Sequence, residues 1–365
     1  MCVCIVKSPN RTDVFKKTYP IFLQWHVTSK CDQKCRHCYM FDSPFYLSEA
    51  KNELSLQSCK SIIDDFVETK TRLNTMGNIV FSGGDPLLRR DIFEIINYAR
   101  VKNVDMIGMM GNSYHLNEES SLKLKESGVF AYQISLDGME KTHDYFRRPG
   151  SFNDAIRGFK VLKDAGISAT CMFTLSKVNM NELINVIRLC ADLGIDAFDF
   201  DRLVPVGSAS EMKESMIEPE EYKSFLIKIK EEYDRLRALG YKTSFGYKDN
   251  LWSLVFDERE MFEHNLIPSG YMLERGCIIG KGGLAVLADG NVLACRRLPL
   301  LVGKLPEQKI YDVLFKSESL KKLKDFSKVE KCCSCENLKD CGGCRAIAYA
   351  HSGGNYYAPD PQCWC

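Results

Sequence analysis

Three cysteines lie within eight positions in the stretch SKCDQKCRHCY, at Cys31, Cys35 and Cys38. Two chemistries suit three thiols spaced so closely. A zinc ion would need a fourth ligand, for which His37 or His26 is available nearby. A cubane iron–sulfur cluster held by three cysteines instead keeps one iron open, and an open iron can chelate a small molecule. The spacing favours the second chemistry, with the small molecule in place of a fourth thiol.

The C-terminal quarter of the chain holds a second group of regularly spaced cysteines. A Cys-x12-Gly-x4-Cys pattern is followed by Cys-x2-Cys-x5-Cys-x2-Cys, and one more cysteine comes after eighteen intervening residues. The members of this group are Cys277, Cys295, Cys332, Cys335, Cys341, Cys344 and Cys363. Such clustering is typical of metal or iron–sulfur ligation.

The seventeen cysteines also bear on the redox compartment. The N-terminal stretch MCVCIVKSPNRTDVFKK lacks the apolar core of a signal peptide, so we expect a cytoplasmic protein whose thiols stay reduced. Ligation then explains the clustered cysteines better than disulfides do. The isolated Cys59, Cys171 and Cys190 lie in apolar or amphipathic stretches, and we expect them to be buried thiols.

Charge and hydropathy argue against two classes of partner. The 49 basic and 48 acidic residues leave a net charge of +1, which does not favour bulk binding of nucleic acid or of an anionic membrane. No uninterrupted apolar run approaches the ~18 residues that a membrane-spanning helix needs. Hydrophobic residues make up 45% of the 365 residues, and this length favours one large domain plus a smaller one.

The region between the two cysteine groups alternates between strand-like and helical patterns. Six apolar runs, rich in β-branched or aromatic residues, are typical of buried strands, and they lie at 20–28, 78–82, 104–111, 130–136, 168–175 and 197–204. Helical spacing occurs between them, for example over 56–73 and 153–165. Successive strand–helix units imply parallel strands joined by right-handed crossovers. We therefore predict an α/β fold, an open partial (β/α)6 TIM-like barrel with its active site at the C-terminal strand ends.

The first cysteine group resembles the signature of the radical S-adenosylmethionine (radical SAM) superfamily, in which C-x3-C-x2-C precedes an aromatic residue, here Tyr39. Four later stretches resemble the family in the same order. SGGDP resembles its GGEP element with Asp85 in place of Glu, and MGNS keeps only Asn112 of TNG. ISLDG matches the fourth-strand element, and HDYFRRPGSF resembles HDxFRG-x-GSF.

The resemblance implies a site. Cys31, Cys35 and Cys38 would hold a [4Fe–4S] cluster whose open iron chelates S-adenosylmethionine. The residues implied to contact that cofactor are Tyr39, Gly83, Gly84, Asp85, Pro86, Asn112, Ser135, Asp137 and Arg147. The reduced cluster would cleave the cofactor to a 5′-deoxyadenosyl radical, which abstracts a hydrogen atom from the substrate.

The second cysteine group resembles the SPASM extension, which carries auxiliary [4Fe–4S] clusters. The resemblance implies two such clusters, the first at Cys277, Cys295 and Cys344 and the second at Cys332, Cys335, Cys341 and Cys363. The first set supplies three ligands, one fewer than a [4Fe–4S] cluster can take from the protein. The fourth iron is then either open or bound by Glu274, Cys2, Cys4, Cys333 or Cys365. A pair of zinc knuckles is the alternative for this region.

Four segments follow from these assignments. They are an N-terminal segment (1–18), the radical SAM partial barrel (19–210), a helical linker (211–272) and the SPASM domain (273–365). The linker carries PEEYKSFLIKIKEEYDRLRALG, a charged amphipathic helix expected to dock on the exterior of the barrel. In the SPASM domain, LAVLADGNVLAC predicts a hairpin that presents Cys295.

The resemblance favours a peptide maturase that installs a thioether or carbon–carbon crosslink in a ribosomally made precursor. Few residues precede the first strand, so a separate leader-binding protein would be needed. A flavodoxin or a ferredoxin-type protein would donate electrons.

A tetrapyrrole (haem-precursor) side-chain decarboxylase is the alternative. The tail CGGCRAIAYAHSGGNYYAPDPQC resembles such enzymes, and the pair Arg296-Arg297 would clamp a substrate carboxylate. A non-catalytic iron–sulfur electron-transfer protein is a third possibility, which the cofactor-site stretches disfavour.

Overall fold

A single ten-stranded sheet organises the molecule, which the computed structural model describes over residues 20–256, 279–280, 282–338 and 341–365. Its strand order is β10-β9-β8-β1-β2-β3-β4-β5-β6-β7. The strands are β1 (Ile21–Thr28), β2 (Gly77–Gly83), β3 (Met106–Met110), β4 (Ala131–Ser135), β5 (Ser168–Leu175), β6 (Ala197–Arg202), β7 (Ser244–Phe245), β8 (Gly283–Val286), β9 (Asn291–Cys295) and β10 (Leu298–Lys304).

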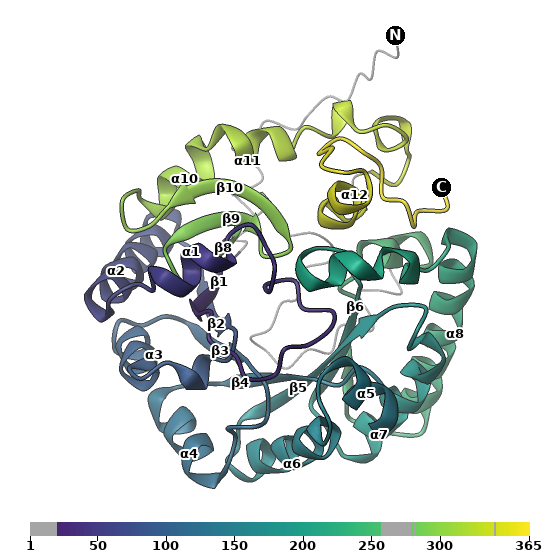
Figure 1. Ribbon diagram of the computed structural model, residues 1–365, viewed down its shortest axis with the longest axis horizontal. Helices are drawn as coiled ribbons and strands as arrows, with labels where there is room; N and C mark the ends of the chain where they lie inside the picture. The colour runs from purple at the N-terminus through teal and green to yellow at the C-terminus, as the bar shows by residue number, and fades with distance from the viewer. Residues whose placement is uncertain (1–19, 257–278, 281, 339–340) are drawn as a thin grey trace.

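The strands from β8 through β7 pair in parallel, and only β8–β9 and β9–β10 are antiparallel. The sheet curves into an incomplete ring, with β10 and β7 as its edges in the described part of the chain (Figure 1). The predicted partial barrel is confirmed, and the six predicted strands are β1 to β6.

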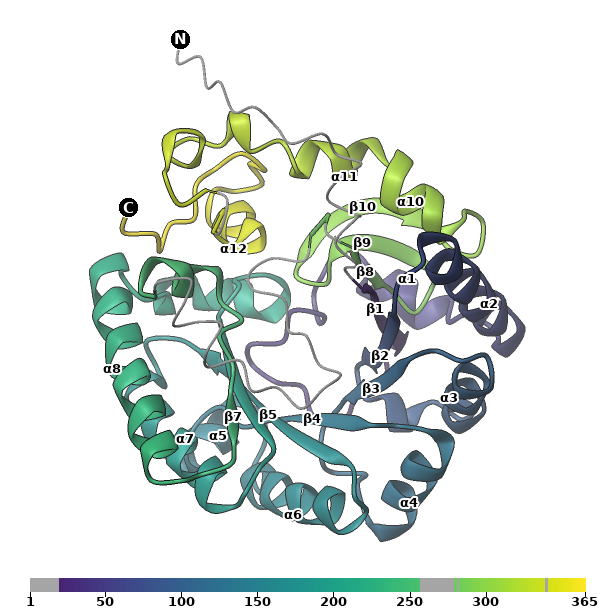
Figure 2. The same ribbon diagram turned by 180° about the vertical axis from the view of Figure 1, so that it is seen from behind.

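Helices cover the outer face of the ring in both views (Figures 1 and 2). The long ones are α2 (Leu56–Leu73), α3 (Ile92–Val101), α4 (Glu118–Ser127), α6 (Ser151–Asp164), α7 (Leu183–Asp192) and α8 (Pro219–Ala238). Shorter ones are α1 (Tyr46–Lys51), α5 (Glu140–Phe146), α10 (Ile310–Lys316), α11 (Glu318–Leu323) and α12 (Arg345–His351). The charged linker sequence forms α8, which packs beside α7, as predicted.

Local sequence sets the limits of these helices. In α2 the side chain of Ser55 accepts the backbone N–H of Ser58, and Asn74 ends the helix in a left-handed conformation with φ of +48°. A capping serine is common where a helix begins, and a left-handed asparagine is common where it ends. The helix predicted over 153–165 begins two residues earlier, at Ser151.

The two faces of each barrel strand differ in character. On β1, Leu23 and Trp25 are buried in the core shared with the outer helices, whereas Phe22 and Gln24 line a central cavity. The isolated thiols Cys59, Cys171 and Cys190 belong to that core with no exposed surface, as predicted. The outer core therefore supplies burial, and the inner faces are available for polar side chains.

The C-terminal hairpin continues the barrel sheet. Strand β8 pairs with β1 from Phe22↔Gly283 to Trp25↔Val286, and β9 and β10 extend this edge. The predicted hairpin is confirmed, with Gly290 at φ of +85° in its turn. The segment from α11 to the C-terminus lies between β10 and α8 in both views (Figures 1 and 2). The four-segment division remains a prediction, since one sheet joins residues of the barrel and of the C-terminal region.

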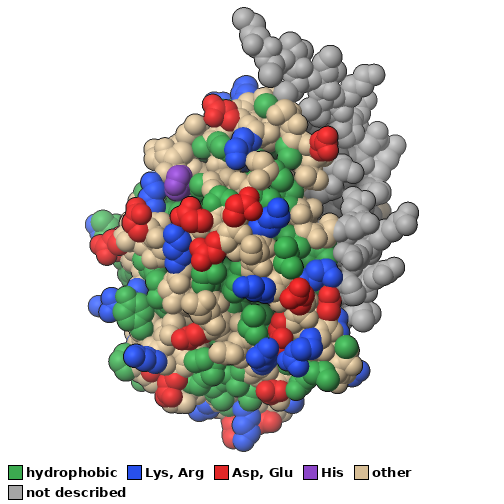
Figure 3. Space-filling view, turned by 90° about the vertical axis from the view of Figure 1, so that its right-hand side faces the viewer, with side chains coloured by type: hydrophobic (Ala, Val, Ile, Leu, Met, Phe, Trp, Pro, Cys, Tyr) green, Lys and Arg blue, Asp and Glu red, His purple; other side chains and the backbone are tan. Residues whose placement is uncertain are grey.

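The surface matches the balanced composition. Acidic and basic side chains are interspersed over the face that carries α8 (Figure 3). Within the described residues, every helix falls short of the length and apolar character that a membrane crossing requires.

Candidate active site

The first cysteine group lies on the loop after β1, at the C-terminal edge of the parallel strands. Cys31, Cys35 and Cys38 are half-buried and line a cavity of about 170 Å³. This cavity is also lined by six of the residues implied to contact the cofactor, namely Tyr39, Gly83, Gly84, Asn112, Ser135 and Arg147. The fold thus brings together residues from the ends of four strands.

The glycines of the SGGDP stretch let two loops approach each other. The backbone N–H of Gly84 donates to the oxygen of Thr28 (2.9 Å), and that of Asp85 donates to the oxygen of Lys30 (2.7 Å). A Cβ at Gly84 would collide with the backbone oxygen of Lys30, and Gly83 has φ of +138°. Glycine is therefore required at both positions for the contact with the cysteine-bearing loop.

The three thiols do not converge as the ligands of a single zinc ion would. Burial raises the pKa of Cys31 and of Cys35 to about 11, so a bound cation is needed to hold them as thiolates. Among the described residues, no three cysteine sulfurs lie within 4.8 Å of one another. Zn–S bonds of ~2.3 Å would bring such sulfurs within about 4 Å.

The two histidines considered as zinc ligands have other partners. His26 Nε2 lies 3.1 Å from the Tyr39 hydroxyl and Nδ1 lies 3.4 Å from Glu49 Oε2. His37 Nε2 lies 3.1 Å from Asp137 Oδ2. Neither the sulfurs nor the histidines converge on one point, so the arrangement in this structure does not favour the zinc alternative for the first cysteine group.

Asp137 is a buried carboxylate that binds Arg147, one of the residues that line this cavity. Burial raises the pKa of this carboxyl, but Arg147 and His37 lower it further, so the pKa lies well below its usual range. Arg147 Nε donates to Asp137 Oδ2 (2.6 Å), and the backbone N–H of Thr174 donates to Oδ1 (2.8 Å). These groups occupy both oxygens, and Asp137 is not among the residues that line the cavity. In this structure Asp137 holds Arg147 in place, and its contact with the cofactor remains a prediction.

That ion pair aims Arg147 at the first cysteine group. Its Nη1 lies 3.6 Å from Cys35 Sγ, and Arg147 lowers the pKa of that thiol although burial raises it more. The resemblance implied that Arg147 contacts the cofactor. The structure shows a guanidinium held between Asp137 and Cys35, with its outer edge in the cavity wall.

Asp85 offers a buried carboxylate oxygen without a partner. Oδ1 accepts the backbone N–H of Leu87 (3.1 Å), while Oδ2 has no hydrogen-bond partner in the described structure. Burial raises the pKa of Asp85 to about 7, and His115 lowers it in part. Asp85 is buried and, like Asp137, does not line the cavity, although Gly84 beside it does. An ammonium group that reached Oδ2, such as the amino group of S-adenosylmethionine, would satisfy this oxygen. Pro86 begins the following 3₁₀ turn behind Asp85 and does not line the cavity.

Two residues beside Asp85 were not predicted. Asp32 Oδ2 lies 2.6 Å from His115 Nε2, and Asn112 Nδ2 donates to Asp32 Oδ1 (3.2 Å). Oxygen or nitrogen atoms of Asp32, Asp85 and His115 lie within 4.8 Å of one another. Asp32 sits between the first two cysteines of the signature, but nothing in the local sequence indicates that His115 would reach it.

A larger cavity of about 300 Å³ occupies the interior of the barrel. It shares part of its wall with the cavity at the first cysteine group. The shared residues are Met110, Gln133, Met172, Asp201, Arg202, Arg296 and Arg297. Cys295 and Cys344 of the second group also line the larger cavity. The two cysteine groups are therefore connected through the interior of one barrel.

Cations outnumber anions along the shared wall. Asp201 accepts from Lys248 Nζ (2.7 Å) and lies 3.4 Å from Arg297. No carboxylate of the described residues pairs with Arg296, whose guanidinium lies 5.3 Å from the Tyr39 ring centroid and donates to Met110 Sδ (3.3 Å). The predicted arginine pair thus projects into the barrel, and Lys248 is a further cation that sequence reasoning missed.

The cysteines of the second group fall into two sets. Cys332, Cys335, Cys341 and Cys363 line one small cavity of about 20 Å³. Cys295 and Cys344 line the central cavity and lie next to Arg297, which lowers the pKa of Cys344 although burial raises it more. The ligand sets that the resemblance implies divide the cysteines in the same way and remain predictions, and Cys277 lies outside the described residues.

The thiols proposed to complete the first auxiliary set are placed in part. Cys365 is exposed, and its electrostatic partners are Cys363 and Cys335, so it lies beside the second set. Cys2, Cys4 and Glu274 lie outside the described residues. Cys333 follows Cys332 directly, on the same 3₁₀ turn (Cys332–Ser334) as the second set.

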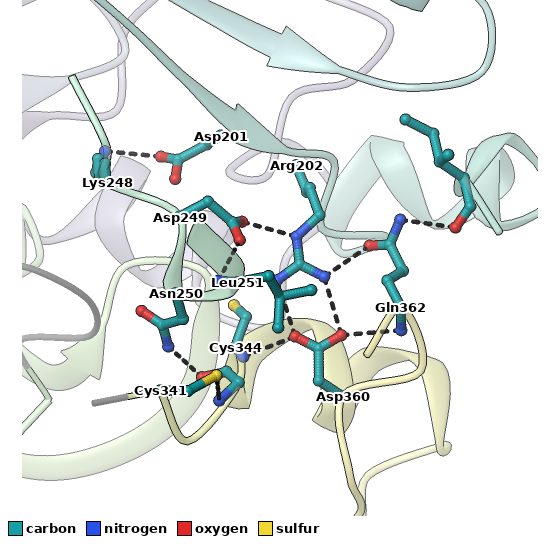
Figure 4. Close-up of polar contacts among 12 residues, drawn as sticks. Asp201, Arg202, Lys248, Asp249, Asn250, Leu251, Cys341, Cys344, Asp360 and Gln362 are labelled. Atoms are coloured by element: carbon teal, nitrogen blue, oxygen red, sulfur yellow. Dashed lines mark hydrogen bonds and ion pairs between the residues drawn. The ribbon is translucent and has the colours of Figure 1, made fainter. Parts of the chain in front are cut away.

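Arg202 joins the barrel to the second cysteine group (Figure 4). Its Nε donates to Asp249 (2.7 Å), and Nη1 and Nη2 donate to the two oxygens of Asp360 (2.9 and 2.8 Å). Asp360 also accepts the backbone N–H of Cys344 (2.8 Å). Gln362 accepts a fourth bond from the guanidinium (3.1 Å). A side chain at the end of β6 therefore fixes a cysteine that lies far away in the sequence.

Comparisons with known proteins agree with this geometry. A model of the radical SAM superfamily matches residues 25–190, and a model of the SPASM iron–sulfur cluster-binding domain matches residues 277–341. An AdoMet-dependent heme synthase of Methanosarcina barkeri is 31% identical, over 94% of this chain and 96% of the relative. The mycofactocin maturase MftC of Mycolicibacterium smegmatis is 28% identical, over 94% and 82%.

Solved structures with the same fold are more distant in sequence. Streptococcus suis SuiB bound to S-adenosylmethionine has a TM-score of 0.71 and 16% identity, over 95% of this chain and 78% of that chain. Native anSMEcpe with bound AdoMet has a TM-score of 0.72 and 18% identity, over 94% of both chains.

The chain belongs to the radical SAM superfamily and carries a SPASM domain. It is an enzyme that uses a [4Fe–4S] cluster and S-adenosylmethionine, with auxiliary iron–sulfur chemistry in its SPASM domain.

Proposed function

We propose that this enzyme acts on a ribosomally made peptide and installs a thioether or carbon–carbon crosslink. The supporting observation is the central cavity between the two cysteine groups. Its volume of about 300 Å³ is at the lower end of the ~300–1,000 Å³ typical of ligand sites. One or two side chains can enter such a space while the peptide backbone stays outside, whereas a tetrapyrrole with several carboxylate arms would have to enter whole.

The residues at the shared wall suit this role. Met110 and Met172 line both cavities, and their flexible side chains can adapt to different substrate shapes. Arg296 and Arg297 would hold a carboxylate of the substrate, because guanidinium groups bind carboxylates with two parallel hydrogen bonds. The substrate would thereby be oriented between the two cysteine groups.

The ligand assignments are part of the proposal. Cys31, Cys35 and Cys38 would hold the radical-generating cluster, and Asp85 Oδ2 would accept the ammonium group of S-adenosylmethionine. When bound, these groups supply a radical that removes a hydrogen atom from the substrate. Gly83 and Gly84 would give the cofactor access to the loop backbone, and the walls of the barrel would exclude water from the reacting carbon.

Two auxiliary clusters complete the assignment. Cys332, Cys335, Cys341 and Cys363 would hold one, and Cys277, Cys295 and Cys344 the other. The second of these would face the central cavity, where it could take an electron from the substrate. A flavodoxin- or ferredoxin-type donor, a separate leader-binding protein and a cytoplasmic location remain predictions.

A haem-precursor decarboxylase is the second candidate. The surplus of cations along the shared wall favours it, since the residues that line both cavities include Arg202, Arg296 and Arg297 but one carboxylate, Asp201. Propionate groups would match those cations. The similarity to AdoMet-dependent heme synthases also points in this direction.

One mass-spectrometric experiment separates the two candidates. Anaerobically reconstituted enzyme receives S-adenosylmethionine, a reductant and either a cysteine-rich peptide encoded beside the gene or an iron coproporphyrin. Loss of two hydrogen atoms from the peptide, with 5′-deoxyadenosine formed, would support crosslinking. Loss of carbon dioxide plus two hydrogens from a propionate of the porphyrin would overturn it in favour of the second candidate.

A further inference from the structure

Asp199 is a buried carboxylate in the wall of the central cavity that the assignments above leave without a role. It lies on β6 two residues before Asp201, on the same face of the strand, and is 2% exposed. Its neighbour across the sheet is Met172, which lines both cavities. Asp199 thus lies next to the wall between the proposed cofactor and substrate sites.

One oxygen of Asp199 is buried without a hydrogen bond of normal geometry. Oδ1 accepts the backbone N–H of Phe200 (2.8 Å), and the backbone N–H of Lys248 also lowers the pKa of the carboxyl. Oδ2 makes no hydrogen bond of normal geometry in the described structure. A Cβ at Gly246 would collide with this carboxylate, so the glycine leaves the space that Asp199 occupies. An unpartnered buried carboxylate oxygen is costly, and a functional role is one explanation of such a group.

The other acidic groups of the cavity are occupied. Asp201 accepts from Lys248 Nζ (2.7 Å), and Asp249 accepts from a guanidinium (2.7 Å). Asp196 Oδ2 accepts a backbone N–H (2.8 Å). Within the described lining of the cavity, Asp199 alone combines burial with an unpartnered carboxylate oxygen.

We propose that Asp199 accepts the proton released when the peptide substrate is crosslinked, an inference that rests on the proposed function. Forming a thioether breaks one C–H bond and one S–H bond and makes one C–S bond. The hydrogen atom of the C–H bond goes to the adenosyl radical, the proton of the S–H bond goes to Asp199, and the remaining electron goes to an oxidised auxiliary iron–sulfur cluster. Propionate decarboxylation releases carbon dioxide and needs no such proton acceptor.

The electrostatic surroundings of Asp199 suit this task. Burial raises its pKa to about 7, Lys248 lowers it in part and Asp201 raises it. The other titratable group facing it is Tyr233 of α8, whose own pKa is raised well above 10 by burial and by Asp199. A base whose pKa lies near the working pH transfers protons efficiently. The ionised form of Asp199 predominates above that pKa, so coupling should slow as the pH falls below about 7.

The first test compares Asp199→Asn with the wild type on the peptide that the wild type crosslinks. We expect the variant to form 5′-deoxyadenosine but to yield crosslinked peptide about 100-fold more slowly, the lower range for a general base. The fall in coupling rate below pH 7 should also disappear. Undiminished coupling with an unchanged pH profile would overturn the inference. Asp192→Asn, a surface carboxylate that accepts the Tyr241 hydroxyl, is the control and should behave as wild type.

The second test needs no substrate, so it separates failure of this inference from failure of the proposed function. Infrared difference spectra of the full-length reconstituted enzyme follow the carbonyl band of a protonated carboxylic acid. We expect the wild type to show bands that titrate near pH 7 from both Asp85 and Asp199. The Asp199 band should be lost in Asp199→Asn and shifted in Gly246→Ala, while the Asp85 band stays unchanged in both variants. Identical bands in the wild type and in Asp199→Asn would refute the assignment whatever the products are. A wild type with the Asp199 band that crosslinks no peptide would refute the proposed function.

Discussion

Replacing Arg202 by Met would test whether the barrel positions the auxiliary cysteines. The substitution removes the guanidinium that binds Asp249, Asp360 and Gln362, while a side chain of similar length still fills the space. Asp360 would keep its bond to the backbone N–H of Cys344 but would lose its counter-ion. We expect the region around Cys344 to lose stability and iron.

The expected magnitude follows from burial. The side chains of Arg202, Asp249 and Asp360 are 1%, 4% and 1% exposed. Removing one member of a buried ion pair costs about 3–5 kcal/mol, because the remaining charge stays desolvated. Here two carboxylates lose the same cation, which favours the upper part of that range. A loss of about 3–5 kcal/mol corresponds to roughly a hundred- to several-thousand-fold in an equilibrium constant.

The effect should depend on pH with a defined sign. In the wild type, burial raises the pKa of Asp360 but Arg202 lowers it further, so this carboxyl stabilises the fold above its unfolded pKa and loses that contribution in acid. Burial already raises the pKa of Asp249. Without Arg202 both pKa values are raised, and the folded variant then binds more protons than the unfolded chain. The destabilisation by Arg202→Met should therefore shrink as the pH falls from about 8 to about 6.

Hydrogen exchange of the reconstituted enzyme, followed by mass spectrometry over residues 341–364, measures this loss directly, and iron analysis accompanies it. Arg188→Met is the matched control, because Arg188 is 48% exposed and its partner Glu232 keeps Arg235 at 2.7 Å. We expect the control to change stability by less than about 1 kcal/mol. A loss of protection below about fivefold in Arg202→Met, with full iron content, would refute the reasoning.

Three further variants test other parts of the site. Cys35→Ala should abolish formation of 5′-deoxyadenosine and remove one cluster's iron; full cleavage activity would contradict the ligand assignment. Gly84→Ala should weaken binding of S-adenosylmethionine at least tenfold in equilibrium dialysis, because its Cβ would collide with the backbone of the loop that carries Cys31; unchanged affinity would show that the loop can move away. Arg296→Gln should raise the KM for a carboxylate-bearing substrate by about tenfold or more with a smaller effect on AdoMet binding, since a charge-assisted hydrogen bond contributes about 1.5–3 kcal/mol; an unchanged KM would remove the clamp from the proposal.

The local sequence was sufficient for much of the framework. The six strands, the helix over Leu56–Leu73 and the C-terminal hairpin follow from hydrophobic periodicity and turn residues, which are properties of short stretches. The three cysteines of the first group also form a local pattern, since a single loop carries all of them. Their spacing therefore predicted a cluster before the fold was known.

Tertiary structure decided the interior of the barrel. The run AFDFDRLV was interpreted as a buried apolar strand, yet its alternate residues Asp199 and Asp201 face the cavity, where a residue from the segment after β7 neutralises one of them. Arg202 binds Asp360, which lies 158 positions away. Asp137, which the family resemblance places at the cofactor, accepts hydrogen bonds from Arg147 and from the backbone N–H of Thr174, which lie 10 and 37 positions away. Such pairings depend on which strand ends meet after the sheet curves, and no periodicity within one segment encodes that.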